Sequence, residues 1–171
     1  MYIGRWRIFM ILDQFPNFEL SVSLPPLMCR TITYLATALG AGISWAIDGS
    51  CALALQGVNV HPHDIDILTD RAGAYSIETV LAAFARMPVE YGETERYRSY
   101  FGIFIINGIE VEVMGALQVF RFGHWSEIQD PGSTGVRHVL LEGVDVPVVH
   151  LNYLESSGYL DERLKLEADQ S

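Results

Sequence analysis

Cysteine is scarce in this chain of 171 residues: only Cys29 and Cys51 occur, and both lie in largely apolar stretches. Two such cysteines do not provide the disulfide framework of a small secreted domain, and they do not form a cysteine-rich metal motif. We interpret both as small buried hydrophobic residues. This interpretation favours a reducing compartment.

Basic residues are also few, since 11 Lys and Arg stand against 21 Asp and Glu, with a formal net charge of -10 and a pI near 4.8. Nonspecific binding to nucleic acid needs many cationic side chains that neutralise phosphates. The composition therefore argues against extended nucleic acid as a partner. It favours a small-molecule or protein substrate, and mildly a cationic small molecule.

Long apolar runs are absent as well. Asp13 and Pro16 interrupt the apolar run near the N-terminus, and no other stretch reaches the ~20 uninterrupted apolar residues that a membrane-spanning helix needs. We therefore expect no signal peptide and no membrane association, and we predict a cytoplasmic location.

Half of the residues are apolar, and the length suits one domain with a substantial core. We expect an irregular N-terminal arm over residues 1–27, one main domain over residues 28–150, and a C-terminal helix over residues 151–171 that packs on the same domain. Helices and strands alternate early and a hairpin follows later, which predicts an α/β (α+β) fold with a mixed β-sheet flanked by helices.

Periodicity and turn residues place the individual elements. The predicted helices cover residues 28–39, a short segment after Gly49-Ser50, residues 75–87 with Ser76 as N-cap, and residues 152–168. The predicted strands cover residues 43–47, 63–68, 98–106, 109–114, 138–141 and 146–151, with tight turns at Asn107-Gly108 and Gly143. Residues 116–131 show no clear pattern.

Asp64 and Asp66 are the first candidates for chemistry. They are two residues apart in a predicted strand, so their side chains share a face while Ile65 and Ile67 point to the core. Adjacent carboxylates repel unless a cation or proton lies between them, and Mg2+ prefers such oxygen ligands and brings substrate phosphates. The alternative is an amphipathic strand that ends in water.

Gly49-Ser50 precedes this acidic pair by about the length of a helix. Glycine allows a close approach of the backbone to a ligand, and the start of a helix offers free N–H groups to a phosphate. The turn is neither a Walker A loop nor a Gly-x-Gly-x-x-Gly motif, so those two classes of nucleotide-binding protein are set aside. The alternative is that Asp48 or Ser50 simply caps a short helix.

A third carboxylate would complete a site for two metal ions. Glu110 and Glu112 share one face of the predicted strand 109–114, and Glu112 is our choice because it lies further from the exposed turn. Both glutamates could instead be solvated edge residues. His61 and His63 beside the acidic pair raise the further alternative of a transition-metal site, although phosphate contact or structural hydrogen bonding suits them better.

Four motifs follow one another in the order Trp45-x-x-Asp48-Gly49-Ser50, Gly57, His61-Pro62-His63-Asp64-Ile65-Asp66-Ile67 and Val111-Glu112-Val113. In this order they resemble the DNA polymerase beta-like nucleotidyltransferase superfamily, particularly a small member of its lincosamide and aminoglycoside nucleotidyltransferase-like branch. The resemblance covers roughly residues 28–115, and the rest of the chain matches only in general architecture.

The resemblance implies a nucleotidyltransferase domain that uses Asp64, Asp66 and Glu112 as catalytic metal ligands for two Mg2+ ions. Gly49 and Ser50 would bind the triphosphate of a nucleoside triphosphate such as ATP, the co-substrate. The enzyme would transfer a nucleoside monophosphate to a hydroxyl and release pyrophosphate. An aminoglycoside, a lincosamide, a protein hydroxyl and an RNA end remain open as acceptors, and a small molecule is favoured, as in antibiotic resistance.

Two departures leave a second function open. Glu112 stands where aspartate is commoner, and His61 stands where relatives often carry arginine. A non-catalytic nucleotide- or partner-binding protein, such as a regulator or a toxin-antitoxin component, would also keep this fold. The short chain has no room for a large recognition domain, so the acceptor pocket would need the C-terminal helix or a second subunit of a homodimer.

Overall fold

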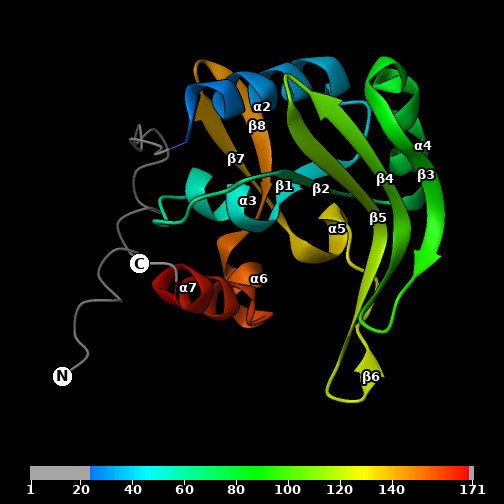
Figure 1. The fold of residues 1–171 in the computed structure, drawn as a ribbon, viewed down its shortest axis with the longest axis vertical. Helices are drawn as coiled ribbons and strands as arrows, with labels where there is room; N and C mark the ends of the chain where they lie inside the picture. Colours follow the sequence, from blue (N-terminus) through cyan, green and yellow to red (C-terminus); the bar gives the residue numbers. More distant parts are fainter. Residues whose placement is uncertain (1–23, 170–171) are drawn as a thin grey trace.

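A mixed sheet of eight strands forms the centre of the computed structural model, which describes residues 24–169 (Figure 1). The strands are β1 Trp45–Asp48, β2 Ile65–Thr69, β3 Ala85–Glu93, β4 Tyr97–Ile106, β5 Ile109–Arg121, β6 His124–Trp125, β7 Val136–Leu141 and β8 Val144–Val149. Their order is β3-β4-β5-β2-β1-β8-β7, and the short β6 pairs with β5. The β2–β5 and β1–β8 pairs are parallel and the others are antiparallel. The predicted mixed sheet and fold class are confirmed.

Helices lie on both sides of this sheet. They are α2 Pro26–Leu39, α3 Gly49–Leu55, α4 Arg71–Val80, the 3-10 helix η1 Ala82–Phe84, α5 Pro131–Thr134, α6 Leu151–Ser156 and α7 Tyr159–Asp169. α2 packs against β8, and α4 packs against β3, β4 and β5. α6 and α7 contact each other and α3, and they lie apart from α2 and α4 (Figure 1). None of the helices within residues 24–169 is long and apolar enough to cross a membrane.

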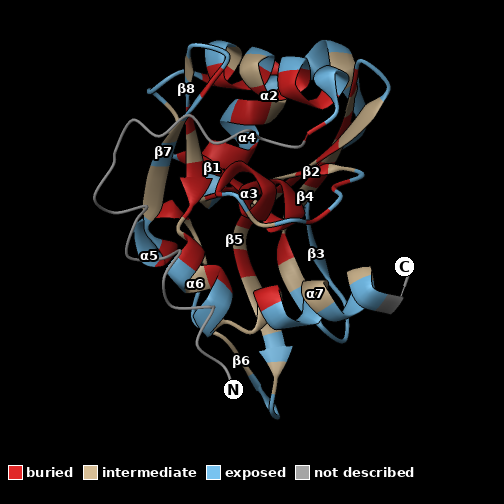
Figure 2. Ribbon diagram, turned by 90° about the vertical axis from the view of Figure 1, so that its left-hand side faces the viewer, coloured by how far each residue is buried: buried red, intermediate tan, exposed pale blue. Residues whose placement is uncertain are grey.

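The core lies between α2, α3, α4 and the central strands, where buried residues concentrate (Figure 2). Every residue of α3 is buried, which explains why its sequence is almost entirely small and apolar. Cys29 and Cys51 are buried free thiols in this core, so their interpretation as hydrophobic residues is confirmed. The predicted arm falls mostly outside the described residues, and α2 begins at Pro26, just inside the predicted arm.

The hairpin predicted at Asn107-Gly108 is confirmed. Both residues have positive φ, 54° and 78°, as the favoured two-residue turn requires. β5 extends well beyond residue 114, to Arg121, β6 follows in the segment that showed no pattern, and α5 begins at the last residue of that segment. The predicted C-terminal helix is two helices, because Gly158 with φ of 80° separates α6 from α7.

The helix predicted over residues 75–87 is wrong in its bounds. α4 begins at Arg71, because Asp70 is its N-cap and accepts a hydrogen bond of 2.6 Å from the Gly73 backbone N–H. It ends at Val80, and Met87 belongs to the edge strand β3. Ser76 therefore lies on the exposed middle of the helix and is not its N-cap.

Candidate active site

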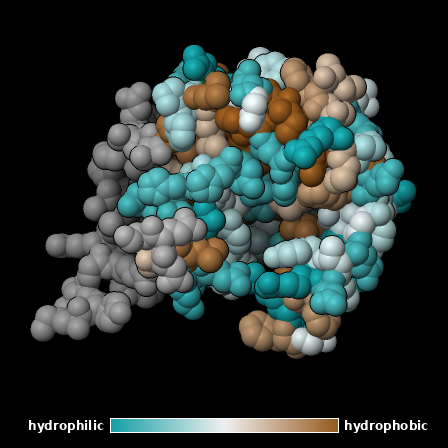
Figure 3. Space-filling model, in the orientation of Figure 1, coloured by the Kyte–Doolittle hydropathy of each residue, from teal (hydrophilic) through white to brown (hydrophobic). Residues whose placement is uncertain are grey.

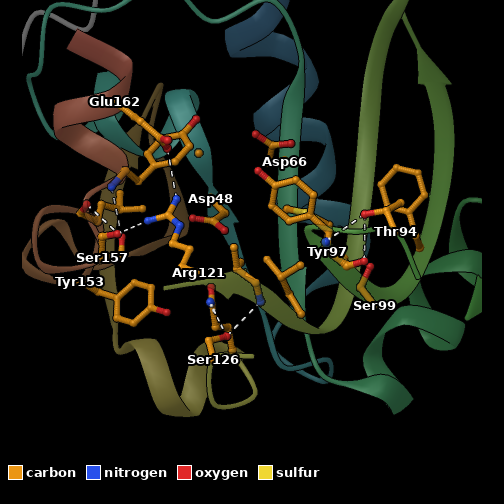
Figure 4. Close-up of a pocket in the computed structure, with 18 of the residues that line it drawn as sticks. Asp48, Asp66, Thr94, Tyr97, Ser99, Arg121, Ser126, Tyr153, Ser157 and Glu162 are labelled. Carbon is orange, nitrogen blue, oxygen red and sulfur yellow. Dashed lines mark hydrogen bonds and ion pairs between the residues drawn. The ribbon is translucent and has the colours of Figure 1, made fainter. Parts of the chain in front are cut away.

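Three carboxylates form a row across the middle of the sheet. Asp66 of β2 lies directly opposite Asp48 of β1 on one side and Glu112 of β5 on the other. Residues opposite each other on neighbouring strands project from the same face of a sheet. Figure 4 shows Asp48 and Asp66 among the residues that line a cavity. We call Asp48, Asp66 and Glu112 the carboxylate row; the sequence suggested no role for Asp48 beyond that of a helix cap.

Asp64 lies beside this row but outside the sheet. β2 begins at Ile65, so the prediction that a strand 63–68 holds Asp64 and Asp66 on one face needs correction. Asp64 stands in the bend before the strand. Its charge nevertheless raises the pKa of both Asp66 and Glu112, which indicates that its carboxylate lies near theirs.

The carboxylate row carries more negative charge than its surroundings neutralise. Burial, and then the charges of Asp64, Asp48 and Glu112, raise the pKa of Asp66 well above its usual range, against a smaller opposite effect of Arg163. Burial raises the pKa of Asp48 to about 6. Burial, followed by the charge of Asp64, also raises the pKa of Glu112. A bound divalent cation would relieve this repulsion.

The donor atoms fit a hard cation, because carboxylate oxygens are the ligands that Mg2+ prefers. Within residues 24–169, no three His, Cys, Asp or Glu side chains are grouped closely enough to hold a metal ion as they stand. Ligation would therefore need rotation of the Asp64, Asp66 or Glu112 side chains toward one another. The chemistry of the site fits Mg2+, and its side-chain arrangement is not preformed.

Gly49 brings the start of α3 against the carboxylate row. Its φ is 63°, and a Cβ built at this position would collide with Oδ2 of Asp66 and lie 3.3 Å from Oη of Tyr159. Gly49 lines the cavity, whereas Ser50 is only 3% exposed and does not. Asp48 occupies the N-cap position of α3 without a side-chain capping hydrogen bond, so its carboxylate does not cap the helix.

The two candidate glutamates occupy different surroundings. Oε2 of Glu110 lies 3.0 Å from Nη1 of Arg86 in an ion pair with an exposed arginine. Glu112 lines the cavity and stands opposite Asp66. The structure thus brings Glu112 together with Asp66 and leaves Glu110 at the edge of the site.

His61 has a structural contact. Its ring Nδ1 lies 2.9 Å from Oε2 of Glu167, and its backbone N–H donates to Oε1 of the same residue. Arg163 donates a hydrogen bond of 3.0 Å to the His61 carbonyl oxygen. These contacts attach α7 to the loop before Asp64, which supports structural hydrogen bonding over a transition-metal site.

A cavity of about 870 Å3 lies next to the carboxylate row. The strands β4 and β5 form one side of it, and α6 with the start of α7 forms the other, so that a hollow opens between them (Figures 3 and 4). Tyr153, Tyr159 and Arg121 line it and were not found from the sequence. Burial, and then the charge of Asp66, raise the pKa of Tyr159, whose hydroxyl therefore stays protonated. Arg121 donates hydrogen bonds to the Ser157 carbonyl and to Glu162.

The mixed sheet, the carboxylate row and the glycine at the start of α3 together define a nucleotidyltransferase fold. The family model described as aminoglycoside-2''-adenylyltransferase matches residues 32–168, and the chain belongs to this family. The resemblance to the aminoglycoside branch of the nucleotidyltransferase superfamily is thereby confirmed. Nucleotidyl transfer is the general activity of such a family, and a nucleotide is its substrate.

A solved structure agrees with this assignment. A crystal structure from Thermotoga maritima, of a protein provisionally assigned as a nucleotidyltransferase, is 36% identical and superposes with a TM-score of 0.73, covering 86% of this chain and 91% of that one. An antigenic nucleotidyltransferase-like protein from Paracoccidioides brasiliensis is 14% identical, with a TM-score of 0.46 and coverage of 78% of this chain and 65% of that one. The comparison with curated proteins found no significant match.

Proposed function

We propose that the protein is a Mg2+-dependent nucleotidyltransferase that moves a nucleoside monophosphate, adenylate in the first instance, from a nucleoside triphosphate to a hydroxyl of a small molecule. The observation that carries this proposal is the register that sets Asp48, Asp66 and Glu112 opposite one another, beside Gly49 and a cavity. Four mutually repelling carboxylates, Asp64 included, are difficult to explain as a purely structural feature.

Asp64, Asp66 and Glu112 are the residues that would hold Mg2+, with two ions as in other phosphoryl-transfer sites. When bound, Mg2+ neutralises the triphosphate and makes the acceptor hydroxyl a better nucleophile. In the reaction, the acceptor oxygen forms a bond to the α-phosphorus, the bond to pyrophosphate breaks, and the hydroxyl proton is released.

The protein's own residues contribute positioning. Gly49 presents backbone instead of a side chain beside Asp66, which leaves room for phosphate oxygens close to the carboxylate row. We assign Glu112 to the acceptor side, because it is the member of the row on β5, the strand that continues along the cavity. The walls formed by β5 and α6 partly shield the reacting groups from water, which strengthens the electrostatic interactions there.

Calorimetric titration with ATP, GTP, CTP and UTP, with and without Mg2+, tests this proposal. We expect binding of at least one nucleotide that requires Mg2+ and is lost in Asp66→Asn and in Glu112→Gln. Glu110→Gln is the matched control, since Glu110 contacts Arg86 at the edge of the site. Pyrophosphate release with an acceptor should fall by about 100-fold or more in Glu112→Gln and by less than about twofold in Glu110→Gln.

The competing function is a non-catalytic binding protein with the same fold. It is favoured by the finding that no metal-binding group is preformed within the described residues. Folded wild-type protein that binds no nucleotide, or binds one equally well without Mg2+ and in Asp66→Asn, would support this alternative and contradict the enzyme.

A further inference from the structure

The strand β5 changes the face that it presents to the cavity. Glu112 and Met114 line the cavity first, followed by Leu117, Val119 and Arg121, so the series passes from even to odd positions. The register explains the change: Gly115 pairs with Tyr100 and Gln118 with Arg98, which places three steps on β5 against two on β4. The extra residue is a β-bulge.

Ala116 occupies this bulge with φ of 52°. The left-handed conformation is unfavourable for a residue with a Cβ and is normally taken by glycine at such bulges. Strain of this kind persists where the surrounding structure demands it and is common at functional sites. Without the bulge, strand alternation would turn Gln118 and Phe120 toward the cavity.

The bulge therefore creates an uncharged floor next to the carboxylate row. Its members are Phe101 of β4 and Met114, Leu117 and Val119 of β5, all of which line the cavity. Phe101 is opposite Met114, and Tyr97 is opposite Val119, so β4 and β5 form one continuous surface. We call these four side chains the apolar floor.

Outside the carboxylate row the cavity is lined by two glutamates, Glu93 and Glu162. Glu93 accepts a hydrogen bond from the Tyr91 hydroxyl, and Glu162 is paired with cations. Nη2 of Arg121 lies 3.2 Å from one Glu162 oxygen, and Nη2 of Arg96 lies 4.0 Å from the other. A polycationic acceptor on the apolar floor would lose water around its amines and gain no carboxylate partner from the floor in return. An apolar face would instead gain free energy from burial against the same surface.

We propose that the acceptor is an uncharged hydroxyl compound whose apolar ring or chain lies on the apolar floor, with its hydroxyl toward Glu112. This inference rests on the proposed function, which places the acceptor beside Glu112. It departs from the polycationic acceptor that the family's description suggests. The Ala116 bulge is then a specificity device, because it selects which side chains of β5 face the acceptor.

The test measures binding of three hydroxyl compounds to the full chain saturated with a non-hydrolysable ATP analogue and Mg2+. The probes are glucose, phenyl β-glucoside and the polyamine tobramycin. We expect phenyl β-glucoside to bind at least about tenfold more tightly than glucose, because its ring buries apolar area. Tobramycin should bind no more tightly than glucose once salt has screened its attraction to the acidic surface.

Three variants of β5 test whether the apolar floor produces the preference for phenyl β-glucoside. Val119→Glu introduces a charge on the floor and should remove the preference for phenyl β-glucoside, while Gln118→Glu adds the same charge to the opposite face of β5 and should preserve it. Ala116→Gly retains the bulge in a conformation that suits glycine and should also preserve the preference. Circular dichroism confirms that each variant is folded.

Several results would overturn the inference while leaving the proposed function intact. With the analogue bound normally, binding of tobramycin that is tighter than that of glucose excludes an apolar acceptor. Equal binding of glucose and phenyl β-glucoside excludes it as well. Weaker binding of the analogue in Val119→Glu, with unchanged binding of the glucoside, would assign the floor to the nucleobase instead. Failure of the wild type to bind the analogue contradicts the proposed function itself.

Discussion

Gly49 is the single residue whose replacement should most directly disturb the carboxylate row. Gly49→Ala introduces a Cβ that collides with Asp66 Oδ2 at a positive φ of 63°. Gly40 is a matched control, with φ of 59° and open space around its missing Cβ. We expect Gly40→Ala to cost about 1–3 kcal/mol of stability from the backbone alone, because its φ of 59° and ψ of -164° are adopted almost only by glycine. Gly49→Ala adds the collision with Asp66, so it should cost about 1–3 kcal/mol more than Gly40→Ala and also abolish nucleotide binding.

Urea unfolding and calorimetric titration of both alanine variants check this prediction. Equal unfolding free energies for the two variants would mean that Asp66 moves aside without cost, and would remove Gly49 from the site. Retained nucleotide binding in a folded Gly49→Ala protein would have the same consequence.

The individual site residues were only partly predictable from the sequence. Asp66, Glu112 and Gly49 were predicted because they belong to short motifs, and all three line the cavity. Asp48 was missed as a member of the row, because the antiparallel register of β1 with β2 depends on tertiary pairing that local pattern does not encode. Ser50 belongs to the same motif as Gly49 but is buried away from the cavity. Its predicted role in binding nucleotide remains a prediction.

At the scale of elements, the start of α4 differs between the structure, where Asp70 is the N-cap, and the sequence prediction, which chose Ser76. Asp70→Ala removes the capping hydrogen bond to the Gly73 backbone N–H and should lower the unfolding free energy by about 1 kcal/mol. Ser76→Ala replaces an exposed residue inside the helix with a better helix former, so it should be neutral or slightly stabilising. Chemical denaturation of both variants provides the measurement, and a larger loss for Ser76→Ala would restore the predicted boundary.

The sequence pattern misplaced the end of α4 and missed β3 for physical reasons. Eight of the nine residues of β3 are exposed, so the strand lacks the alternation of buried and exposed positions that reveals a strand. Leu81 and Phe84 extend the apolar pattern of α4 beyond its end at Val80. The hairpin of β4 and β5 was predictable, in contrast, because Asn107-Gly108 defines its turn locally. The bulge at Ala116 has no comparable sequence signal, since alanine carries no preference for positive φ.

The attachment of α7 to the loop before Asp64 should depend on pH. Hydrogen bonds from His61, first from its side chain and then from its backbone, hold the pKa of Glu167 below its usual value of 4.5. A group with a lowered folded-state pKa stabilises the protein above its unfolded-state pKa, and this contribution disappears as the pH falls through the folded-state pKa. We therefore expect the melting temperature of Glu167→Gln to lie below that of the wild type at pH 7, with the difference closing at a pH below 4.5.

Thermal melts of the two proteins across this pH range provide the measurement. Glu127→Gln is the control, because Glu127 is exposed and makes no ion pair within residues 24–169. A difference between wild type and Glu167→Gln that stays constant down to low pH would show that the carboxylate charge does not hold α7 in place.

At the scale of the whole molecule, the stability of residues 24–169 comes from one hydrophobic core. No disulfide adds to it, because the chain's two cysteines are unpaired. Burial raises the pKa of both thiols, and the reactive species is the thiolate, so neither should react with a thiol reagent in the native state. Cys29 lies on α2 and Cys51 on α3, and Cys51 donates to the Asp64 carbonyl oxygen at the start of the site. Cys51 Sγ also lies 3.5 Å from Met28 Sδ of α2, so thiol labelling reports opening at α2 and at its contact with α3.

If residues 24–169 unfold cooperatively, both thiols become reactive through the same opening. Cys29→Ala and Cys51→Ala each leave one thiol for labelling in low concentrations of urea. For each variant, we expect the opening free energy measured at its remaining thiol to equal the free energy of global unfolding of that variant. We also expect both quantities to fall with urea concentration at the same slope. Opening of α2 with a small slope, while Cys51 stays protected, would mean that α2 separates from the core locally. Equal values would mean that the carboxylate row, whose strands share that core, loses its register only when the entire molecule unfolds.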